Sequence, residues 1–402
     1  MVRQSVHIVG ASLAGLRAAE ALRRRGFAGP IALLGDEPHV PYDRPPLSKQ
    51  FLAGEWEADR LALSSAERLA ELDLDLRLGV RAEGFDLERR RLRTSDGDEP
   101  VDGLLIATGA RCRTLPGIDD MAGVHVLRNI DQAMALRNDL DQQPNRVVVV
   151  GAGFIGAEVA ATCRGRGLDV TMVEALSAPL VRVLGPEMGE FMAAVHRAQG
   201  IDLRCGVGVD ALVPDGSGRV AQVRLSDGSE ISADVVVIGI GVIPNTEWLA
   251  DSGLTIENGV VCDASLAAAP GVVAAGDVAR WPNQRFDEVM RVEHWDNAVE
   301  QGTYAADRLL AADHETIDPF CPVPWFWSDQ YDLKIQLAGR IRPDDEIVMV
   351  TGAMEDRRFA ALVGRNGRLV GVLGVNRPRH VMQYKTLIHQ GVSLAEAMAA
   401  AI

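Results

Sequence analysis

Residues 6–15 are Val-His-Ile-Val-Gly-Ala-Ser-Leu-Ala-Gly, and residues 147–156 are Val-Val-Val-Val-Gly-Ala-Gly-Phe-Ile-Gly. In both stretches four mostly apolar residues precede a glycine-rich turn, and residues rich in helix formers follow it. The pattern predicts a short buried strand, a tight turn and a helix, twice in one chain. The copies begin 141 residues apart, which is the spacing of a duplicated domain and not of a solenoid repeat.

A second apolar run followed by an acidic residue completes each copy. We expect a strand over Ile31–Leu34 before Asp36 or Glu37, and a strand over Val170–Val173 before Glu174. This is the arrangement of a Rossmann unit, in which glycines form the turn, admit a pyrophosphate and let the helix pack on the strand. The helix N-terminus then offers free N–H groups to the phosphates. The sequence therefore predicts two nucleotide-binding sites.

The residues around each turn bear on which nucleotide is bound. Ser12 stands where the second glycine of the first copy is expected, and its small side chain carries a hydroxyl that can donate to phosphate. Asp36 or Glu37 would accept from an adenosine ribose hydroxyl in the first site. Glu174 would do so in the second site and would repel a 2′-phosphate, which favours NADH over NADPH; Arg182 nearby would weaken that preference.

Each copy is followed by a predicted pair of antiparallel strands around an Asp-Gly turn. The first pair is Arg89–Thr94 with Val101–Ile106, and the second is Val220–Leu225 with Ile231–Ile238. A strand at Val272–Ala275 and a helix over residues 297–310 are also expected. From Phe320 the chain alternates apolar and charged residues, which indicates a third domain containing a sheet.

Composition restricts the class of protein. The 402 residues are 47% hydrophobic and 24% charged, as in globular proteins, and a net charge of −15 disfavours nucleic acid as a partner. The five cysteines are too far apart for a CxxC motif, a metal site or a disulfide framework, which indicates a reducing compartment. Met1–Ser5 leads directly into an apolar strand, which leaves no room for a signal peptide. The 11-residue apolar run Val147–Ala157 is too short to span a membrane. We therefore expect a cytoplasmic protein with no membrane partner.

Several motifs outside the two turns resemble those of one family. They are Ala107-Thr108-Gly109, the segments at 239–244 and 275–277, Pro41–Lys49, Arg291–Trp295 and Pro324–Tyr331. Together with the two nucleotide units they resemble the glutathione-reductase-type flavoproteins, and among these the ferredoxin reductases that serve bacterial oxygenases. The resemblance covers nearly the whole chain.

The resemblance implies an α/β fold with two Rossmann-like nucleotide-binding domains of the glutathione-reductase type plus a C-terminal α+β domain. A discontinuous FAD-binding domain would comprise residues 1–110 and 240–319, with an NADH-binding domain at 111–239 inserted. Residues 320–402 would form the C-terminal domain.

The resemblance also implies the cofactors FAD and NADH and their binding residues. Asp277 has a further rationale, because a carboxylate at a strand end can accept from a ribityl hydroxyl. The candidate cofactor-binding residues are Gly10, Ser12, Ala14, Gly15, Asp36, Arg44, Lys49, Ala82, Gly109, Arg128, Asp277, Trp295, Gly151, Gly153, Phe154, Gly156, Glu174 and Gly241. Of these, the resemblance implies that Ala14, Asp36, Lys49, Ala82, Arg128, Asp277 and Trp295 contact FAD.

Lys49 and Glu158 are the candidate catalytic residues. Lys49 is one of only three lysines in the chain, and its compact ammonium fits where a planar guanidinium would not. The resemblance pairs it with Glu158 near the flavin N5 edge, where the pair would position the nicotinamide and stabilise charge on the reduced flavin. Phe154 resembles the aromatic residue that shields the flavin until nicotinamide displaces it.

The implied reaction is hydride transfer from NADH to FAD, followed by single-electron transfer to a [2Fe-2S] ferredoxin that supplies a monooxygenase or dioxygenase. Residues 40–50 contain no cysteine, so electrons would pass directly outward from the flavin. The implied ferredoxin is acidic, and the proposed docking residues are Arg308, Trp325 or Trp327, Lys334, Arg340, Arg342, Arg377, Arg379 and Lys385.

Two alternative functions stay open at this stage. One is a flavin NADH oxidase or a nitrite-reductase-type electron-transfer component, which would consume NADH in air without an added protein. The other is an NADH-regulated interaction protein resembling apoptosis-inducing factor, in which binding matters more than turnover.

Overall fold

The computed structural model describes residues 3–118 and 121–400, so Met1 and Val2 of the predicted leaderless N-terminus lie outside it. The chain divides into two compact units, each assembled from three segments. Unit 1 comprises Met1–Asp43, Ala62–Arg111 and Ile243–Phe326, and unit 2 comprises Arg44–Leu61, Cys112–Val242 and Trp327–Ile402. The division into three domains at the boundaries given above stays a prediction.

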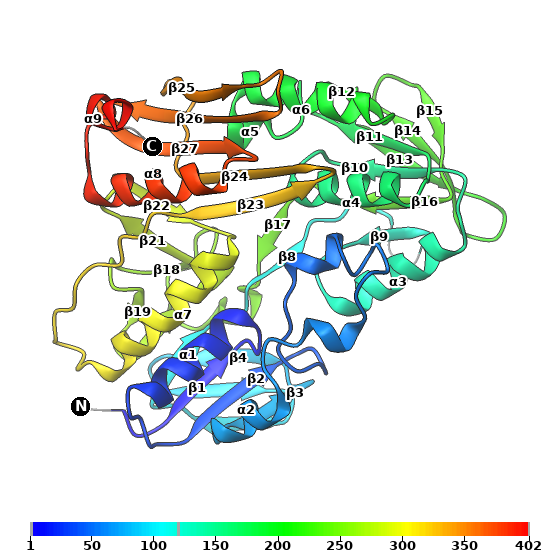
Figure 1. Cartoon of the computed structure of the whole chain (residues 1–402). Helices are drawn as coiled ribbons and strands as arrows, with labels where there is room; N and C mark the ends of the chain where they lie inside the picture. The colour runs from blue at the N-terminus through cyan, green and yellow to red at the C-terminus, as the bar shows by residue number, and fades with distance from the viewer. Residues whose placement is uncertain (1–2, 119–120, 401–402) are drawn as a thin grey trace. The chain divides into compact units, whose positions relative to one another are not determined.

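Unit 1 is built on a six-stranded sheet in the order β19-β20-β7-β1-β2-β3, which is parallel except for β19. Two helices, α1 (Leu13–Arg24) and α7 (Trp295–Leu310), lie side by side against it (Figure 1). Every residue of the central strand β1 is buried, as expected for a strand covered on both faces. The strands are β1 Val6–Val9, β2 Ile31–Gly35, β3 Asp75–Leu78, β7 Gly103–Ile106, β19 Ala267–Ala269 and β20 Val272–Ala274.

Smaller elements complete unit 1. Strands β4, β5 and β6 form an antiparallel sheet, and β18, β21 and β22 form another three-stranded sheet. Their bounds are β4 Ala82–Asp86, β5 Arg91–Thr94, β6 Gly97–Pro100, β18 Val260–Val261, β21 Ala279–Asn283 and β22 Glu288–Arg291. The short helices are α2 Ala66–Glu71, η3 Glu247–Leu249 and η4 Gly276–Val278.

The first predicted strand pair is wrong in its second member. The antiparallel partner of β5 is β6, whereas Gly103–Ile106 is β7 and runs parallel to β1 in the main sheet. All four residues of β7 are buried, so this apolar segment belongs in the middle of a covered parallel sheet. The polar segment β6 is mostly exposed and forms the hairpin instead.

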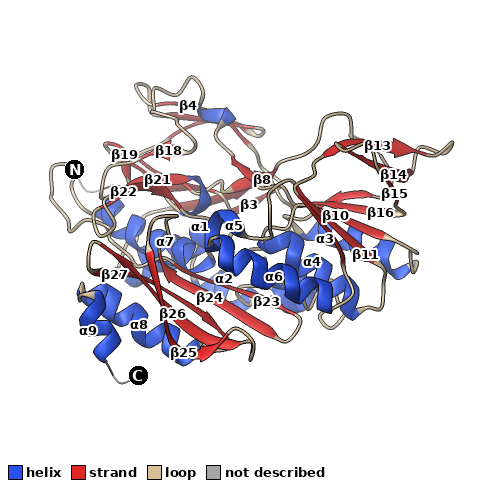
Figure 2. Ribbon diagram, turned by 90° about the horizontal axis from the view of Figure 1, so that it is seen from above, coloured by secondary structure: helices blue, strands red, loops and turns tan. Residues whose placement is uncertain are grey.

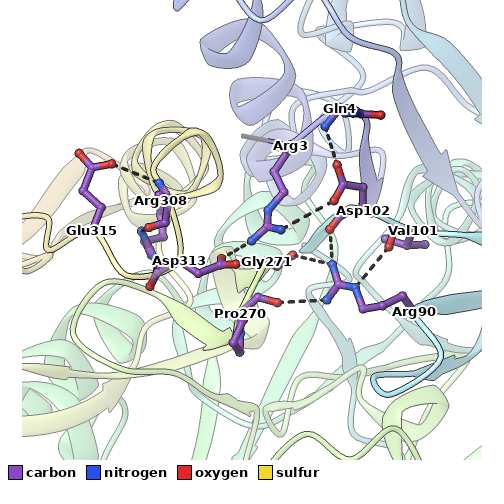
Figure 3. Close-up of polar contacts among 11 residues, drawn as sticks. Arg3, Gln4, Arg90, Val101, Asp102, Pro270, Gly271, Arg308, Asp313 and Glu315 are labelled. Atoms are coloured by element: carbon purple, nitrogen blue, oxygen red, sulfur yellow. Dashed lines mark hydrogen bonds and ion pairs between the residues drawn. The ribbon is translucent and has the colours of Figure 1, made fainter. Parts of the chain in front are cut away.

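Arginine side chains join the segment before β1 to distant parts of unit 1 (Figure 3). The Arg3 guanidinium forms ion pairs with Asp313 and with Asp102, at 3.7 Å for the latter. Arg90 donates to the carbonyl oxygens of Asp102 and Pro270. These contacts join the residues that precede β1, β7 and β20. Because these three strands are neighbours in the sheet, the contacts fix the N-terminal ends of all three relative to one another.

Unit 2 contains a five-stranded parallel sheet in the order β12-β11-β10-β16-β9. Helix α4 (Phe154–Gly165) packs on β10 and β11, and α6 (Pro186–Ala198) contacts β12. The strands are β9 Val124–Val126, β10 Val147–Val150, β11 Val170–Glu174, β12 Asp202–Cys205 and β16 Val235–Ile238. The other helices of this region are η1 Pro45–Ser48, η2 Ala58–Leu61, α3 Ile130–Asp141 and α5 Val181–Leu184.

The second predicted strand pair is also corrected. The segment expected as one strand, Ile231–Ile238, divides into β15 (Glu230–Ser232) and the parallel-sheet strand β16. Strand β15 pairs antiparallel with β14 (Val220–Leu225), which also pairs with β13 (Val209–Pro214). The apolar pattern continues across the break, because residues of both strands are buried in the same hydrophobic cluster.

The C-terminal part of unit 2 is a five-stranded sheet in the order β23-β24-β27-β26-β25. Helix α8 (Pro378–Gln390) packs against β24 and β27, and the C-terminal helix α9 (Leu394–Ala399) contacts β26 and β27 (Figure 2). The strands are β23 Trp325–Gln330, β24 Leu333–Gly339, β25 Glu346–Ala353, β26 Arg358–Arg365 and β27 Arg368–Val375. The remaining strands are β8 Ala110–Cys112 and β17 Val242–Pro244. Among the described residues, no helix is long and apolar enough to cross a membrane.

Candidate functional site

The glycine turn of unit 1 joins β1 to α1, and its backbone conformation leaves no room for a side chain at two of its positions. Gly10 has a φ of +126°, and a Cβ there would lie 2.1 Å from the Ala107 carbonyl oxygen. A Cβ at Gly15 would lie 2.1 Å from the Gly10 carbonyl oxygen. Ser12 is the N-cap residue of α1, but within the described part of the chain its side chain makes no capping hydrogen bond. The first amides of α1 therefore have no side-chain cap, as a phosphate-binding turn requires.

The glycine turn of unit 2 has the same construction between β10 and α4. Gly151 has a φ of +98°, and a Cβ there would lie 2.4 Å from the Gly239 carbonyl oxygen. A Cβ at Gly156 would lie 2.0 Å from the Gly151 carbonyl oxygen. At Gly153, by contrast, the nearest atom to an added Cβ is 4.0 Å away. The first and third glycines are thus required by packing, whereas the second faces open space where a ligand can approach.

The acidic residue of unit 2 is bound to its own glycine turn. Glu174 ends β11, and its Oε2 accepts a hydrogen bond of 2.7 Å from the Ala152 backbone N–H. Its Oε1 accepts one of 2.9 Å from the Leu176 backbone N–H. The backbone therefore fixes this carboxylate at the edge of the turn. Phe154 is the first residue of α4 and is half-buried.

The acidic residue of unit 1 occupies a different position along its strand. The strand registers place Gly35, and not Asp36, level with Glu174. A Cβ at Gly35 would lie 2.7 Å from the Ala11 Cβ, so a side chain does not fit there. Asp36 follows and is exposed, whereas Glu37 is half-buried. Of the two acids that the sequence left open, Asp36 is thus the more accessible one.

Ala14 and Asp277, both predicted to contact FAD, lie close together in unit 1. Asp277 is in η4, directly after Gly276, whose N–H donates to Gln301 Oε1 at 2.7 Å. A Cβ at Gly276 would lie 3.3 Å from the Ala14 Cβ. A Cβ at Gly302 of α7 would lie 2.3 Å from the Ala14 carbonyl oxygen. The start of α1 and the Asp277 turn therefore meet through glycine contacts.

Trp295 is held by a residue that the sequence analysis did not select. Its indole Nε1–H donates to Asp43 Oδ1 at 2.7 Å within unit 1. Asp43 belongs to the Pro41–Lys49 motif, but nothing in that motif alone indicates its partner, which is about 250 residues away. The bond fixes the ring of Trp295 at the start of α7.

Lys49 and Glu158 meet in unit 2, as the sequence analysis predicted. Lys49 Nζ lies 2.7 Å from Glu158 Oε2, and the Glu158 side chain is only 3% exposed. Two serines that were not predicted complete the cluster. Ser48 Oγ donates to Glu158 Oε2 at 2.5 Å, and Ser328 Oγ donates to Glu158 Oε1 at 2.8 Å. The carboxylate thus accepts from three side chains, which is how a buried charge is stabilised.

Other predicted residues are placed singly or in pairs. Arg44 donates to the Arg128 carbonyl oxygen at 2.7 Å within unit 2. Ala82 is the first residue of β4 and is half-buried. Gly109, after β7, and Gly241, after β16, both have positive φ values, of +64° and +103°. These two glycines occupy equivalent positions after the strands that pair with β1 and with β10.

The expectation that Arg308 helps to dock a ferredoxin is contradicted. Arg308 is buried, with 8% exposure, and it donates to the carbonyl oxygens of Ala312 and Asp313 (Figure 3). Its guanidinium satisfies carbonyl groups at and beyond the end of α7, so it offers no surface charge to a partner. The sequence could not show this, because the loop that covers Arg308 has no distinctive pattern.

The C-terminal candidates for docking are more accessible. Arg342 and Arg379 are exposed, and Trp327 is half-buried on β23. Lys334 is paired with Asp329 at 2.8 Å. Partial burial, followed by the positive charges of Arg377, Arg379 and Arg358, lowers the pKa of His380. The start of α8 is therefore a region of positive potential.

The cysteines carry no redox-active pair. All five lie within the described residues and each is free. Burial raises the pKa of Cys163 and of Cys262 to about 12, so neither thiol ionises near neutral pH.

Comparison with known proteins assigns this architecture to a family. A model of the pyridine nucleotide-disulphide oxidoreductases matches residues 4–302. The chain belongs to the pyridine nucleotide-disulphide oxidoreductase family. A second model, of the reductase C-terminal domain, matches residues 325–401. Together these matches confirm the predicted family and fold class of this oxidoreductase.

Within the family, the chain is of the type of the ferredoxin reductases of oxygenase systems. It is 38% identical over 399 residues to rhodocoxin reductase from Rhodococcus erythropolis, covering 98% of this chain and 92% of the relative. It is 34% identical to putidaredoxin reductase from Pseudomonas putida, covering 96% and 91%. A crystal structure of the covalent putidaredoxin reductase-putidaredoxin complex matches with a TM-score of 0.91 at 34% identity, covering 98% of this chain and 94% of that one.

Proposed function

We propose that this oxidoreductase is an NADH-dependent ferredoxin reductase that supplies electrons to an oxygenase through a [2Fe-2S] ferredoxin. The observation that carries the proposal is the presence of two glycine turns of the same construction, one in each unit, in a chain without a redox-active cysteine pair. Two nucleotide sites suit a protein that accepts reducing equivalents from one dinucleotide and holds another as a resident cofactor. The relatives of similar length reported above are named as reductases of rhodocoxin and of putidaredoxin.

Unit 1 fits FAD. The uncapped start of α1 at Ser12 offers its amides to a pyrophosphate, and the exposed Asp36 is available to a ribose. Asp277 directly follows Gly276, which lies beside Ala14 at this same start of α1. When bound, FAD supplies the exchange between a two-electron hydride and single electrons. The protein contributes binding and orientation, through Gly10, Ser12, Gly15, Asp36, Asp277 and Trp295 in unit 1, with Ala82 and Gly109 as further proposed contacts.

Unit 2 fits NADH. Gly153 leaves the turn open, and the carboxylate of Glu174 is fixed at its edge by two backbone N–H groups. A ribose hydroxyl can donate to this carboxylate, whereas a 2′-phosphate would be repelled by it. Phe154, at the start of α4, is the proposed residue that nicotinamide displaces. Gly241 is proposed as a further cofactor contact of this unit. Arg44 and Arg128 are also proposed cofactor contacts, and for Arg128 the resemblance implies FAD.

Lys49 and Glu158 are proposed as the catalytic residues of the hydride step. The ammonium is fixed by a carboxylate that is almost fully buried, so its position is defined before the nicotinamide arrives. A fixed ammonium favours the accumulation of negative charge near it and orients a neutral amide by hydrogen bonding. Glu158 acts on the reaction by orienting Lys49.

The proposed partner is an acidic ferredoxin, and the proposed docking residues are Arg340, Arg342, Arg377, Arg379, Lys385 and Trp327. The positive potential at the start of α8 supports Arg377 and Arg379 in this role. Arg308 is excluded because it is buried. Electron-transfer contacts of this kind are small, and their association is sensitive to salt.

Anaerobic stopped-flow spectroscopy tests the proposed function. The purified yellow protein is mixed with NADH or NADPH, and the bleaching of the flavin absorbance is followed. The reduced protein is then mixed with [2Fe-2S] ferredoxins. We expect rapid bleaching with NADH and rapid reoxidation by at least one ferredoxin. A colourless protein that does not take up FAD, or fast NADH oxidation in air that ferredoxin does not accelerate, would contradict the proposal.

A further inference from the structure

The buried carboxylate of Glu158 is oriented by more than its ammonium partner. Its Oε2 is shared by Lys49 and Ser48, which are adjacent in sequence. Its Oε1 has one side-chain donor, the Ser328 hydroxyl at 2.8 Å. Glu158 and Ser328 are 170 residues apart, and Ser328 is fully buried on β23. Rotation of the carboxylate about its terminal bond is therefore opposed at one oxygen by residues 48–49 and at the other by the C-terminal sheet.

The hydroxyl proton of Ser328 is committed to Glu158 by a second hydrogen bond. Gln330 Nε2 donates to Ser328 Oγ at 3.1 Å, and Gln330 is also fully buried. An oxygen that already accepts from an amide is free to direct its own proton to the carboxylate. The other end of the Gln330 amide, Oε1, is also buried and accepts a hydrogen bond from none of the described residues.

We propose that Ser328 is a positioning residue for hydride transfer: the C-terminal sheet, through the relay from Gln330 to Ser328, holds the Glu158 carboxylate in the orientation that fixes Lys49. This inference rests on the proposed function, because it assumes that the Lys49–Glu158 pair acts in the hydride step. It gives the C-terminal segment a role in the reduction of the flavin as well as in binding a partner. Ser48 makes the corresponding contact on the other oxygen.

Loss of the Ser328 hydroxyl would leave one oxygen of the buried Glu158 carboxylate without its side-chain donor, at a cost in free energy. A hydrogen bond to a charged group contributes more than one between neutral groups, and a buried charge cannot recruit water in its place. Without the Ser328 proton, charge on Glu158 shifts toward Oε2, and the carboxylate can turn about its terminal bond. The Lys49 ammonium then loses its fixed position although Lys49 itself is unchanged.

The first test reads the state of Lys49 directly in the flavin-loaded protein. The chain has three lysines, so 15N labelling of lysine gives three side-chain signals, and Lys334→Arg and Lys385→Arg assign the signal of Lys49. We expect Ser328→Ala to shift or broaden the Lys49 signal. Ser252→Ala is the matched control, because Ser252 is also buried and its hydroxyl donates only to a backbone carbonyl oxygen. An unchanged Lys49 signal in Ser328→Ala would overturn the proposal.

The second test is the pH profile of flavin reduction by NADH. In Ser328→Ala the Glu158 carboxylate loses one hydrogen-bond donor, so we expect the profile of the variant to differ from that of the parent on its acid limb. Lys49 is the ionisable side chain that contacts Glu158. Ser328→Thr keeps the hydroxyl and should restore both the profile and the Lys49 signal. A loss that threonine does not recover would assign the effect to packing and overturn the proposal.

Glu158→Gln distinguishes a failure of the proposed catalytic pair from a failure of the proposed role of Ser328. If Glu158→Gln reduces the flavin as fast as the parent, the proposed catalytic pair is wrong, and the Lys49 signal still decides whether Ser328 positions it. If Glu158→Gln is slow and Ser328→Ala has the parent pH profile, the pair stands and the positioning role of Ser328 is wrong.

Discussion

The Glu174 carboxylate accepts a 2.7 Å hydrogen bond from the backbone N–H of Ala152, in the glycine turn of unit 2. A negative charge is thus fixed at the edge of the proposed NADH site, where it can accept a hydrogen bond from a ribose hydroxyl and repels a phosphate. We expect Glu174→Gln to raise kcat/KM for NADPH relative to NADH by about tenfold, the effect of roughly 1.4 kcal/mol. An added arginine at the neighbouring Ala175 should raise the ratio further.

Steady-state kinetics with both nucleotides measure this ratio. Glu187→Gln is the control, because it removes an exposed acid from the same unit without touching the turn. Unchanged selectivity in Glu174→Gln would count against the ribose role of Glu174.

Lys49→Met should slow the reduction of the flavin by NADH while FAD stays bound. The ammonium is fixed 2.7 Å from Glu158 before substrate binds, and removal of a preorganised charge typically costs a factor of roughly ten to a thousand in rate. Stopped-flow bleaching measures the rate, and the visible spectrum reports bound flavin. Arg68→Met, which removes an exposed cation of unit 1, should reduce at the parent rate. Normal kinetics in Lys49→Met would remove this residue from the mechanism.

The second and third glycines of the turn in unit 2, the proposed NADH site, should respond differently to alanine. A Cβ at Gly156 would lie 2.0 Å from the Gly151 carbonyl oxygen, so Gly156→Ala should lower the free energy of unfolding by about 3 kcal/mol or more. A Cβ at Gly153 meets open space, so Gly153→Ala should unfold like the parent but bind NADH more weakly. Thermal unfolding and NADH titration separate the two effects. Equal stability of the two variants would contradict the packing argument.

The buried histidine of α6 should make the stability of the protein depend on pH. His196 is fully buried, its Nδ1 lies 2.8 Å from the Tyr331 hydroxyl, and burial lowers its pKa from 6.5 to about 4. Above pH 6.5 the imidazole is neutral in both folded and unfolded chains. As pH falls from 6.5 toward 4, only the unfolded chain takes up the proton, so stability is lost over this window.

The expected loss from His196 is about 2 kcal/mol between pH 7 and pH 5. Urea unfolding at the two values measures it. His196→Gln, which stays neutral, should lose less stability over the same range by about that amount. His314→Gln, at an exposed histidine, should behave like the parent. If the parent and His196→Gln have the same pH dependence, His196 is not the group responsible.

Charge reversal at the start of α8 should weaken the proposed ferredoxin interaction without affecting the flavin. Arg379 is exposed beside His380 and Arg377, so Arg379→Glu should raise KM for an acidic ferredoxin several-fold, more at low salt than at high salt. Ferricyanide reduction should stay at the parent rate. Arg89→Glu, an exposed reversal in unit 1, is the control. Equal loss with both acceptors would show that the substitution damages the protein and not the docking face.

The sequence pattern correctly predicts those helices, strands and turns whose formation depends mainly on residues nearby in the chain. The strands β1 and β10, both glycine turns and helix α7 lie where the sequence predicts them, because hydrophobic period and glycine position are local signals. Strand pairing was not local. Gly103–Ile106 was expected in a hairpin and lies in the parallel sheet, because burial on both faces and not proximity in sequence selects its partner.

The residues of the candidate site also differ in whether the sequence could predict them. The pairing of Lys49 with Glu158 came from resemblance, and the structure brings the two together. Ser328 was overlooked, because a serine in a strand has no feature that distinguishes a carboxylate donor from an ordinary buried hydroxyl. Arg308 was misassigned for the converse reason, because an arginine in sequence looks exposed until the chain that covers it is known.

The amino-acid sequence was enough to predict the two glycine turns with their flanking strands and helices, and the motifs spread along it were enough to predict the family. Each turn depends on residues within about thirty positions of one another, where backbone sterics and hydrophobic period act directly. Only the tertiary structure decided that Gly35 and not Asp36 is level with Glu174, that Trp295 is held by Asp43, and that Ser328 completes the environment of Glu158. Those relationships join segments distant in the chain, and the burial of a charge or an indole N–H requires partners that only packing can supply.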